Sequence, residues 1–123
     1  MKKKMLVAAA VVAAAGLVLS GCSGSGAAGS EIVIGASVPL TGPLGTMGTP
    51  VSMGYKAAVD EINAAGGVEF GGAKHKIKLV IQDNASDPAK GASQAKSLVL
   101  DSKAVALLGP VTPPLSIPQA TVA

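Results

Sequence analysis

The chain contains no arginine or tryptophan, and only one cysteine, one histidine, one tyrosine and one phenylalanine among its 123 residues. Without arginine it lacks the planar guanidinium group that clamps phosphates and carboxylates through paired hydrogen bonds. The single cysteine excludes an internal disulfide, a Cys-x-x-Cys redox pair and a multi-cysteine zinc site. One histidine excludes a histidine metal cluster, and the few aromatic rings leave little surface for stacking nucleic-acid bases.

Positive charge is concentrated at the start of the chain. Ten lysines face seven acidic residues, which gives a formal net charge of +3. Three of the lysines are Lys2, Lys3 and Lys4, so the remainder carries seven lysines against seven acids and is neutral. A basic surface for nucleic acid is therefore not predicted, and no nucleic-acid partner is expected.

An export signal follows these lysines. Residues 5–19 form an apolar run that is shorter than the roughly 20 residues needed to span a bilayer and is typical of a signal peptide. The run ends at Leu19-Ser20-Gly21-Cys22, which resembles the lipobox of bacterial lipoproteins. This resemblance implies that residues 1–21 are a signal peptide and that Cys22 is lipidated, anchoring the protein to the cell membrane on its periplasmic or cell-surface side. The alternative is an ordinary exported protein with one free thiol.

The rest of the chain divides into a tether and one domain. Residues 22–30 contain, after the cysteine, only glycine, serine and alanine, which predicts a flexible tether. Residues 31–123 form the only segment with patterned hydrophobicity, and they contain no internal repeat. One folded domain is therefore predicted, held away from the membrane by the tether.

Short apolar runs in this domain predict strands at residues 32–38, 77–81 and 104–108. Such runs are typical of strands buried on both faces of a parallel sheet. Helical segments separate them, so the connections are right-handed crossovers. The predicted fold class is α/β, with a parallel, doubly wound sheet that starts strand–helix–strand–helix–strand.

Two dipeptides, Thr49-Pro50 and Asp87-Pro88, are typical of helix starts. Each pairs a capping residue with a proline that suits the first helical position. The first helix is predicted to end at Gly66-Gly67, and a third helix to begin near residues 116–118. Phe70 is expected to fill part of the core.

A ligand site is predicted at one edge of the sheet. In open α/β sheets ligands bind beyond the carboxyl ends of the strands, where the strand order reverses. If the order is 2-1-3, the loops of residues 39–49 and 109–116 meet there. Both loops lead into helix N-termini, whose unpaired N–H groups and partial positive charge favour a carboxylate. The alternative is that both loops are only tight crossovers.

Several segments of this domain resemble the start of the branched-chain amino-acid binding proteins, the extracytoplasmic receptors of ABC importers. They are Ile34-Gly35, Pro39-Leu40-Thr41-Gly42-Pro43, Asp60-Glu61-Ile62-Asn63-Ala64-Ala65-Gly66-Gly67, Asp87-Pro88-Ala89 and Leu107-Leu108-Gly109-Pro110. The resemblance covers residues 31–123 and implies the type I periplasmic-binding fold, in which two α/β lobes close on a small ligand. This chain then supplies part of the N-terminal lobe, as the N-terminal piece of a longer protein.

The resemblance also implies which residues touch the ligand. Met47 matches the position after the first strand that packs a side chain on the ligand, and a thioether suits an apolar ligand group. Pro113 occupies the position aligned with a serine of the family, and it offers neither a hydroxyl nor an N–H. Thr112 and Ser116 remain as donors in this loop. The departure at Pro113 puts an ordinary α-amino acid in doubt, since the wider family also takes amides, urea-like molecules and aromatic acids.

The resemblance implies a solute-binding lipoprotein of an ABC importer, not an enzyme. It would bind a branched-chain amino acid or a similar small polar molecule and deliver it to permease subunits in the membrane. A ligand-sensing lipoprotein that serves a signalling partner is the main alternative. Neither hypothesis requires a cofactor.

A nucleotide-dependent α/β enzyme is the weaker alternative. The glycines of residues 42–48 follow the pattern G-x-x-G-x-x-G, not the dinucleotide pattern G-x-G-x-x-G, although Asp83 lies where a ribose-binding acid would. Asp83, Asn84 and Asp87 could suggest a cation, but turn and capping duties explain all three, so no metal is predicted. His75, between two lysines, is expected to be solvated in a turn, which makes it an unpromising catalytic base.

Overall fold

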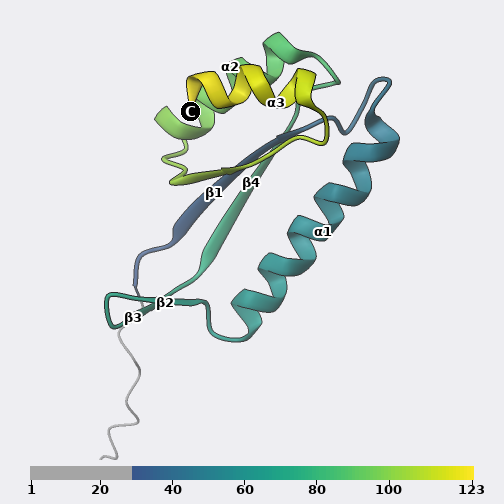
Figure 1. Cartoon of the computed structure of the whole chain (residues 1–123). Coiled ribbons are helices and arrows are strands. Elements are labelled where there is room, and N and C mark those ends of the chain that lie inside the picture. Colours follow the sequence, from purple (N-terminus) through teal and green to yellow (C-terminus); the bar gives the residue numbers. More distant parts are fainter. Residues whose placement is uncertain (1–28) are drawn as a thin grey trace, which may run out of the picture.

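The computed structural model describes residues 29–123, so the predicted signal peptide, Cys22 and most of the predicted tether lie outside the described residues. Strands and helices alternate along most of this part of the chain (Figure 1). In order they are β1 (Ile32–Val38), α1 (Gly45–Ala64), β2 (Val68–Phe70), β3 (Ala73–His75), β4 (Ile77–Asp83), α2 (Pro88–Leu100), β5 (Ala106–Leu108) and α3 (Pro113–Val122).

The main sheet is parallel and has the strand order β4-β1-β5. β1 pairs with β4 along its whole length, from Ile32 opposite Ile77 to Val38 opposite Asp83. β5 pairs with the middle of β1. Helix α1 lies on one face of the sheet, and α2 and α3 pack together on the other (Figure 1). The predicted α/β class and the 2-1-3 strand order are therefore confirmed.

The core lies between the sheet and the pair α2 and α3. Leu98 of α2 and Leu115 of α3 are almost completely buried. Gly35 allows α2 to approach β1, since a Cβ at this position would lie 3.1 Å from the Cβ of Leu98. The apolar residues of the first strand thus form the centre of the domain, as expected for a strand covered on both faces.

Helix α1 begins earlier than predicted, at Gly45 instead of after Thr49, and Pro50 lies inside it. The N–H of Gly45 donates to the carbonyl of Gly42 (3.0 Å), and the loop winds directly into the helix. Gly48, one turn in, packs against the backbone of Pro39. This tertiary contact keeps the segment helical, although Pro50 removes one helical hydrogen bond.

A small antiparallel hairpin of β2 and β3 was not predicted. Its turn is Gly71-Gly72, and both glycines have positive φ angles. Phe70 is 73 % exposed, so its predicted core role is wrong. The hairpin stands beyond the sheet at the amino end of β1 (Figure 1), where the core does not reach.

His75 also departs from its prediction, because it lies in β3 and is half-buried. Its Nδ1 lies 2.7 Å from the carbonyl oxygen of Ser30, and its Nε2 lies 3.2 Å from that of Phe70. The ring is therefore used to fasten the hairpin to the segment that precedes β1.

The last two elements are shifted from their predicted bounds. β5 contains three residues, not five, because the N–H of Ala104 donates to the carbonyl of Leu98 and closes the end of α2 instead. Helix α3 begins at Pro113 rather than near residue 116. Prolines suit the first helical turn, where their missing N–H groups would have had no partner.

Candidate functional site

The two loops proposed to hold a ligand leave the same end of the sheet. β1 and β5 are adjacent and parallel, with Ala36 opposite Leu108, so the segments after them start side by side. Tyr55 of α1 donates its hydroxyl to the carbonyl oxygen of Gly109 (2.9 Å), which ties α1 to the loop after β5. This role of Tyr55 was not predicted from the sequence. The signal was present, because a partly buried tyrosine hydroxyl usually finds a partner.

The residues matched to the family lie on both sides of this end. Met47 is the third residue of α1, and 48 % of it is exposed. Thr112 occupies the cap position of α3, and Pro113 is the first residue of that helix. Ser116 donates its hydroxyl to the carbonyl of Thr112 (2.9 Å). The ligand-contacting roles of these four residues are predictions.

The expected row of free N–H groups is absent at the start of α3. Pro113 and Pro114 have no N–H group, and the N–H groups of Leu115 and Ser116 both donate to the carbonyl of Thr112. The expectation of a carboxylate seat made of amides is therefore wrong at this helix. What remains is the hydroxyl oxygen of Thr112, a buried atom without a hydrogen bond to any of residues 29–123.

The carboxylate of Asp83, at the end of β4, holds the loop that follows β1. Its Oδ1 accepts from the N–H groups of Leu40 (2.9 Å), Thr41 (3.2 Å) and Ala85 (2.8 Å), and its Oδ2 accepts from the hydroxyl of Thr41 (2.6 Å). The hydrogen bond from the Thr41 hydroxyl is the largest cause that lowers the pKa of Asp83, to about 2. The turn duty predicted for Asp83 is confirmed, and no ribose is needed to explain the residue.

A buried polar network joins the strand ends to α2 and α3. The hydroxyl of Ser37 donates to the side-chain oxygen of Gln94 (2.8 Å) and accepts from the amide of Asn84 (3.3 Å). Gln94 in turn donates to the carbonyl of Asp83 (2.9 Å), and Gln119 of α3 donates to the carbonyl of Ser37 (3.3 Å). Satisfied networks of this kind make a core rigid. Here the network fixes the carboxyl ends of β1 and β4 and the position of α3.

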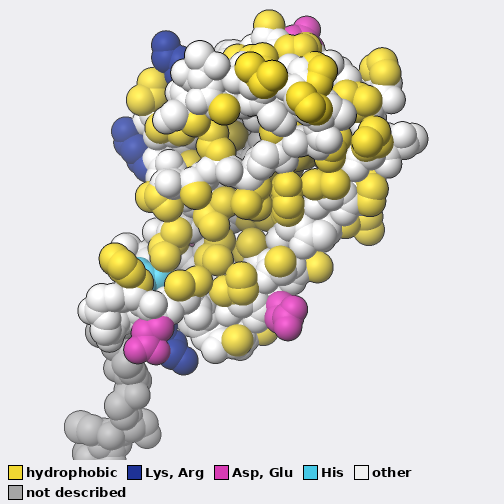
Figure 2. Space-filling model, in the orientation of Figure 1, with side chains coloured by type: hydrophobic (Ala, Val, Ile, Leu, Met, Phe, Trp, Pro, Cys, Tyr) yellow, Lys and Arg dark blue, Asp and Glu magenta, His cyan; other side chains and the backbone are white. Residues whose placement is uncertain are grey.

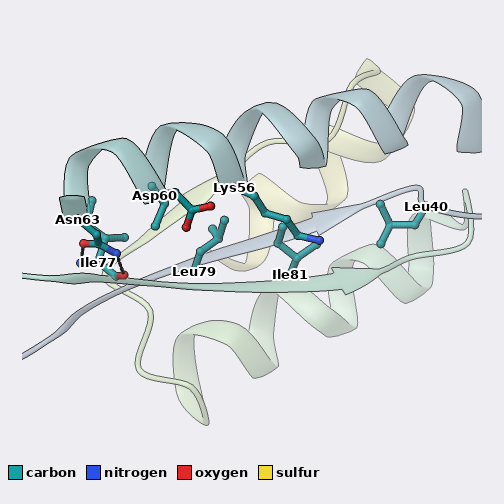
Figure 3. Close-up of a pocket in the computed structure, with 8 residues that line it drawn as sticks. Leu40, Lys56, Asp60, Asn63, Ile77, Leu79 and Ile81 are labelled. Atoms are coloured by element: carbon teal, nitrogen blue, oxygen red, sulfur yellow. Dashed lines mark hydrogen bonds between the residues drawn. The ribbon is translucent and has the colours of Figure 1, made fainter. Parts of the chain in front are cut away.

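Among residues 29–123, cavities lie on both faces of the sheet, and neither of the two described next includes all the matched residues. One, of about 550 Å³, lies between α1 and β4, where Lys56 and Asp60 extend over Leu79 and Ile81 (Figure 3). Asn63 closes its far end by hydrogen bonding both the N–H and the carbonyl of Ile77. The other, of about 360 Å³, lies between β5 and α3 and includes Ser116 and Gln119. The first cavity runs along β4 instead of opening between the two loops.

The described part of the chain, residues 29–123, contains no group of three or more histidine, cysteine, aspartate or glutamate side chains suited to a metal ion. Its helices include none that is both long and apolar enough to cross a bilayer. Hydrophobic side chains gather over α3 and the face below it, whereas charged side chains lie mainly at the rim (Figure 2).

The strand order and crossovers define an open parallel α/β domain, and comparison with known proteins identifies its family. Residues 31–117 match the family described as "Periplasmic binding protein". The chain therefore belongs to the periplasmic binding protein family, as its sequence motifs indicated.

Relatives of known name agree with this assignment. The chain is 39 % identical over 93 residues to the Leu/Ile/Val-binding protein BraC3 of Rhizobium johnstonii, a match that covers 76 % of this chain and 24 % of BraC3. It is 36 % identical over 93 residues to an amino acid binding protein of Pseudomonas aeruginosa, with the same coverage. The chain thus spans about a quarter of the length of these relatives.

Solved structures show the same fold. The substrate-binding protein LivJ of a branched-chain amino acid transporter from Streptococcus pneumoniae, crystallised with isoleucine, superposes with a TM-score of 0.71 at 38 % identity. That match covers 76 % of this chain and 26 % of LivJ. The leucine-binding protein LivK of Thermotoga maritima, at 23 % identity and a TM-score of 0.61, shares the fold.

Proposed function

We propose that this chain is part of an extracytoplasmic solute-binding lipoprotein of an ABC importer. It binds a branched-chain amino acid or a similar small polar molecule and passes it to permease subunits without changing it. The observation that carries the proposal is the meeting of two loops at the carboxyl end of β1 and β5 in a chain whose relatives include Leu/Ile/Val-binding proteins. In parallel α/β sheets this is where ligands bind.

The chemistry of the two loops favours recognition by neutral groups. Residues 39–49 and 109–116 contain no lysine, aspartate or glutamate, but they contain several hydroxyl side chains and Met47. Thr112 supplies a buried hydroxyl that has no partner within residues 29–123. A buried hydroxyl without a partner costs free energy, which would be recovered if the Thr112 side chain rotated to meet a ligand donor or acceptor. Thr112 and Ser116 therefore orient the polar part of the ligand, while Met47 contacts its apolar part and Pro113 shapes the wall.

Residues 31–123 are proposed to form part of one lobe, and a second lobe would supply the remaining partners and close over the ligand. Domain closure around a solute is a common form of hinge motion. Cys22 is proposed as the lipid anchor, because a tether of small residues follows a signal-peptide pattern that ends in a lipobox. Two or more acyl chains give stable membrane attachment, whereas one gives only marginal binding.

The test is ligand binding by the complete encoded polypeptide, produced without its signal peptide. Calorimetry with leucine, isoleucine, valine, simple amides and small organic acids should show saturable binding of at least one compound, which is recovered unchanged. Binding of none of them, or turnover of any, would contradict the proposal. For the anchor, a cell expressing the wild-type gene should incorporate labelled palmitate into the protein, and Cys22→Ser should abolish that labelling.

A further inference from the structure

We propose that Asp83 and Ser86 are positioning residues that hold the loop after β1 in its ligand-ready conformation. The inference rests on the proposed function, because it assigns these residues a role in ligand affinity. Neither side chain belongs to the two loops themselves. Asp83 is the last residue of β4 and Ser86 lies in the turn before α2. Both side chains hydrogen-bond to residues 40–44, and they act on the ligand only through that loop.

Asp83 fixes the first half of the loop. One carboxylate oxygen accepts from the N–H groups of Leu40 and Thr41, and the other accepts from the Thr41 hydroxyl. Hydrogen bonds to a charged acceptor are stronger than those between neutral groups. Because two consecutive amides and a side chain converge on one group, the direction of the chain as it leaves β1 is determined by Asp83.

Ser86 fixes the second half of the loop. Its hydroxyl donates to the carbonyl of Thr41 (2.8 Å) and accepts from the N–H of Leu44 (3.1 Å), the residue before α1. Gly42 lies so close to the turn that a Cβ at this position would be 2.6 Å from the carbonyl oxygen of Ala85. The loop is therefore pressed against the turn as well as hydrogen-bonded to it.

The turn is itself held in an unfavourable backbone conformation. Ala85 and Ser86 have φ angles of 54° and 63°, in the left-handed region that residues with a side chain adopt at a cost. The surroundings maintain this conformation, because Asn84 is fully buried and its N–H donates to the carbonyl of Val38 (3.0 Å). Its side-chain oxygen also accepts from the N–H of Ser86 (3.0 Å). The contacts of Asp83 and Ser86 with residues 40–44, called the brace below, are therefore anchored to the core through Asn84.

The brace connects directly to the candidate ligand residues. Leu44 precedes α1, and its carbonyl accepts from the N–H groups of Met47 and Gly48. A shift of residues 40–44 therefore moves the first turn of α1 and the Met47 side chain with it. A binding-competent loop that is populated only part of the time weakens affinity in proportion to that fraction.

Four variants of the complete encoded polypeptide test the brace. Asp83→Ala removes every side-chain hydrogen bond, whereas Asp83→Asn keeps an oxygen for the three N–H groups and an amide that the Thr41 hydroxyl can accept from. Thr41→Val removes only the bond to Oδ2. Asp101→Ala is the matched control, because Asp101 accepts a single hydrogen bond from Ser97 at the far end of α2.

The first measurement is calorimetry and stopped-flow binding with the tightest ligand of the panel named above. Asp83→Ala should raise the dissociation constant at least about tenfold, mainly through slower association, if the ready conformation falls to a tenth of the population. Asp83→Asn and Asp101→Ala should stay near wild type, and Thr41→Val should lie between. If Asp83→Ala does not fold, Thr41→Val decides. The proposal is overturned if Asp83→Ala binds with wild-type affinity, or, where Asp83→Ala does not fold, if Thr41→Val does.

The second measurement needs no ligand and is amide hydrogen exchange. Asp83→Ala, or Thr41→Val in its place, should lose protection at Leu40, Thr41 and Leu44 but not in the middle of β1, and Asp83→Asn should not. If the wild type binds no panel compound, the proposed function fails. The brace is then tested by amide hydrogen exchange alone. Unchanged protection of residues 40–44 in the deciding variant overturns the brace, whatever the wild type binds.

Discussion

Replacing Gly48 by alanine should force the start of α1 away from the end of β1. A Cβ at this buried position would lie 2.7 Å from the carbonyl carbon of Pro39 and 2.9 Å from its Cγ, and it would also meet the carbonyl oxygen. Carbon atoms pack at about 3.5–4.0 Å, so the two segments must separate by roughly 1 Å. Overpacking of this kind costs about 1–3 kcal/mol.

The magnitude follows from two opposing effects. Alanine is favoured over glycine inside a helix by about 1 kcal/mol, and this gain partly offsets the clash. The net loss in the free energy of unfolding at Gly48 is therefore expected to be about 0–2 kcal/mol. Gly54 provides the matched control, because it lies in the same helix and a Cβ there meets nothing within 4 Å. Gly54→Ala should stabilise the protein by about 1 kcal/mol.

The assay is urea unfolding of both variants in the complete encoded polypeptide, followed by calorimetric titration with the ligand that the wild type binds. Gly48→Ala should unfold at lower urea and bind more weakly, because the displaced turn carries Met47. Gly54→Ala should unfold at higher urea and bind like the wild type. If Gly48→Ala is as stable as Gly54→Ala, the close approach of α1 to Pro39 does not exist as described.

Three further predictions concern stability. Leu98→Ala should destabilise the protein by about 2–5 kcal/mol, because this side chain is fully buried; exposed Leu100 is the control, and equal losses in urea unfolding would contradict the core. Asp87→Ala should cost about 0.5–2 kcal/mol, since Asp87 caps α2 through the N–H of Lys90 (2.8 Å); Asp87→Asn should cost far less, and a similar cost would argue against capping. Folding lowers the pKa of Asp83 from 3.8 to about 2, so the unfolded chain binds more protons between these values. The stabilisation that Asp83 contributes is therefore fully present above about pH 4 and is lost as the pH falls toward 2. Urea unfolding at a series of pH values should show a shallower acid loss in Asp83→Asn, and identical curves would refute the assignment.

The sheet could be predicted from sequence because its signals are local. The apolar run of β1 and the Asp87-Pro88 start of α2 depend on neighbouring residues, and both were placed correctly. The start of α1 depends instead on a tertiary contact between Gly48 and Pro39, which composition cannot reveal. The prediction that Phe70 is buried failed for a related reason, since a large apolar side chain is buried only when its segment faces the core.

The meeting of the two loops at one edge of the sheet was predictable, but the chemistry at the start of α3 was not. The parallel strand order fixes the edge where the two loops meet, so its location followed from the pattern of strands. The prediction of a carboxylate seat at α3 failed for a chemical reason. Pro113 and Pro114 have no N–H group, and the next two N–H groups donate to the carbonyl of Thr112. The brace at Asp83 was seen only as a turn, because its partners Leu40 and Thr41 lie more than forty residues earlier in the chain.

The most direct test of the account is a crystal structure of the complete encoded polypeptide with the compound that it binds. The account predicts that the ligand lies beyond the carboxyl ends of β1 and β5, in contact with Met47 and with the hydroxyl of Thr112. A ligand found in the cavity between α1 and β4, or at the amino ends of the strands, would contradict it.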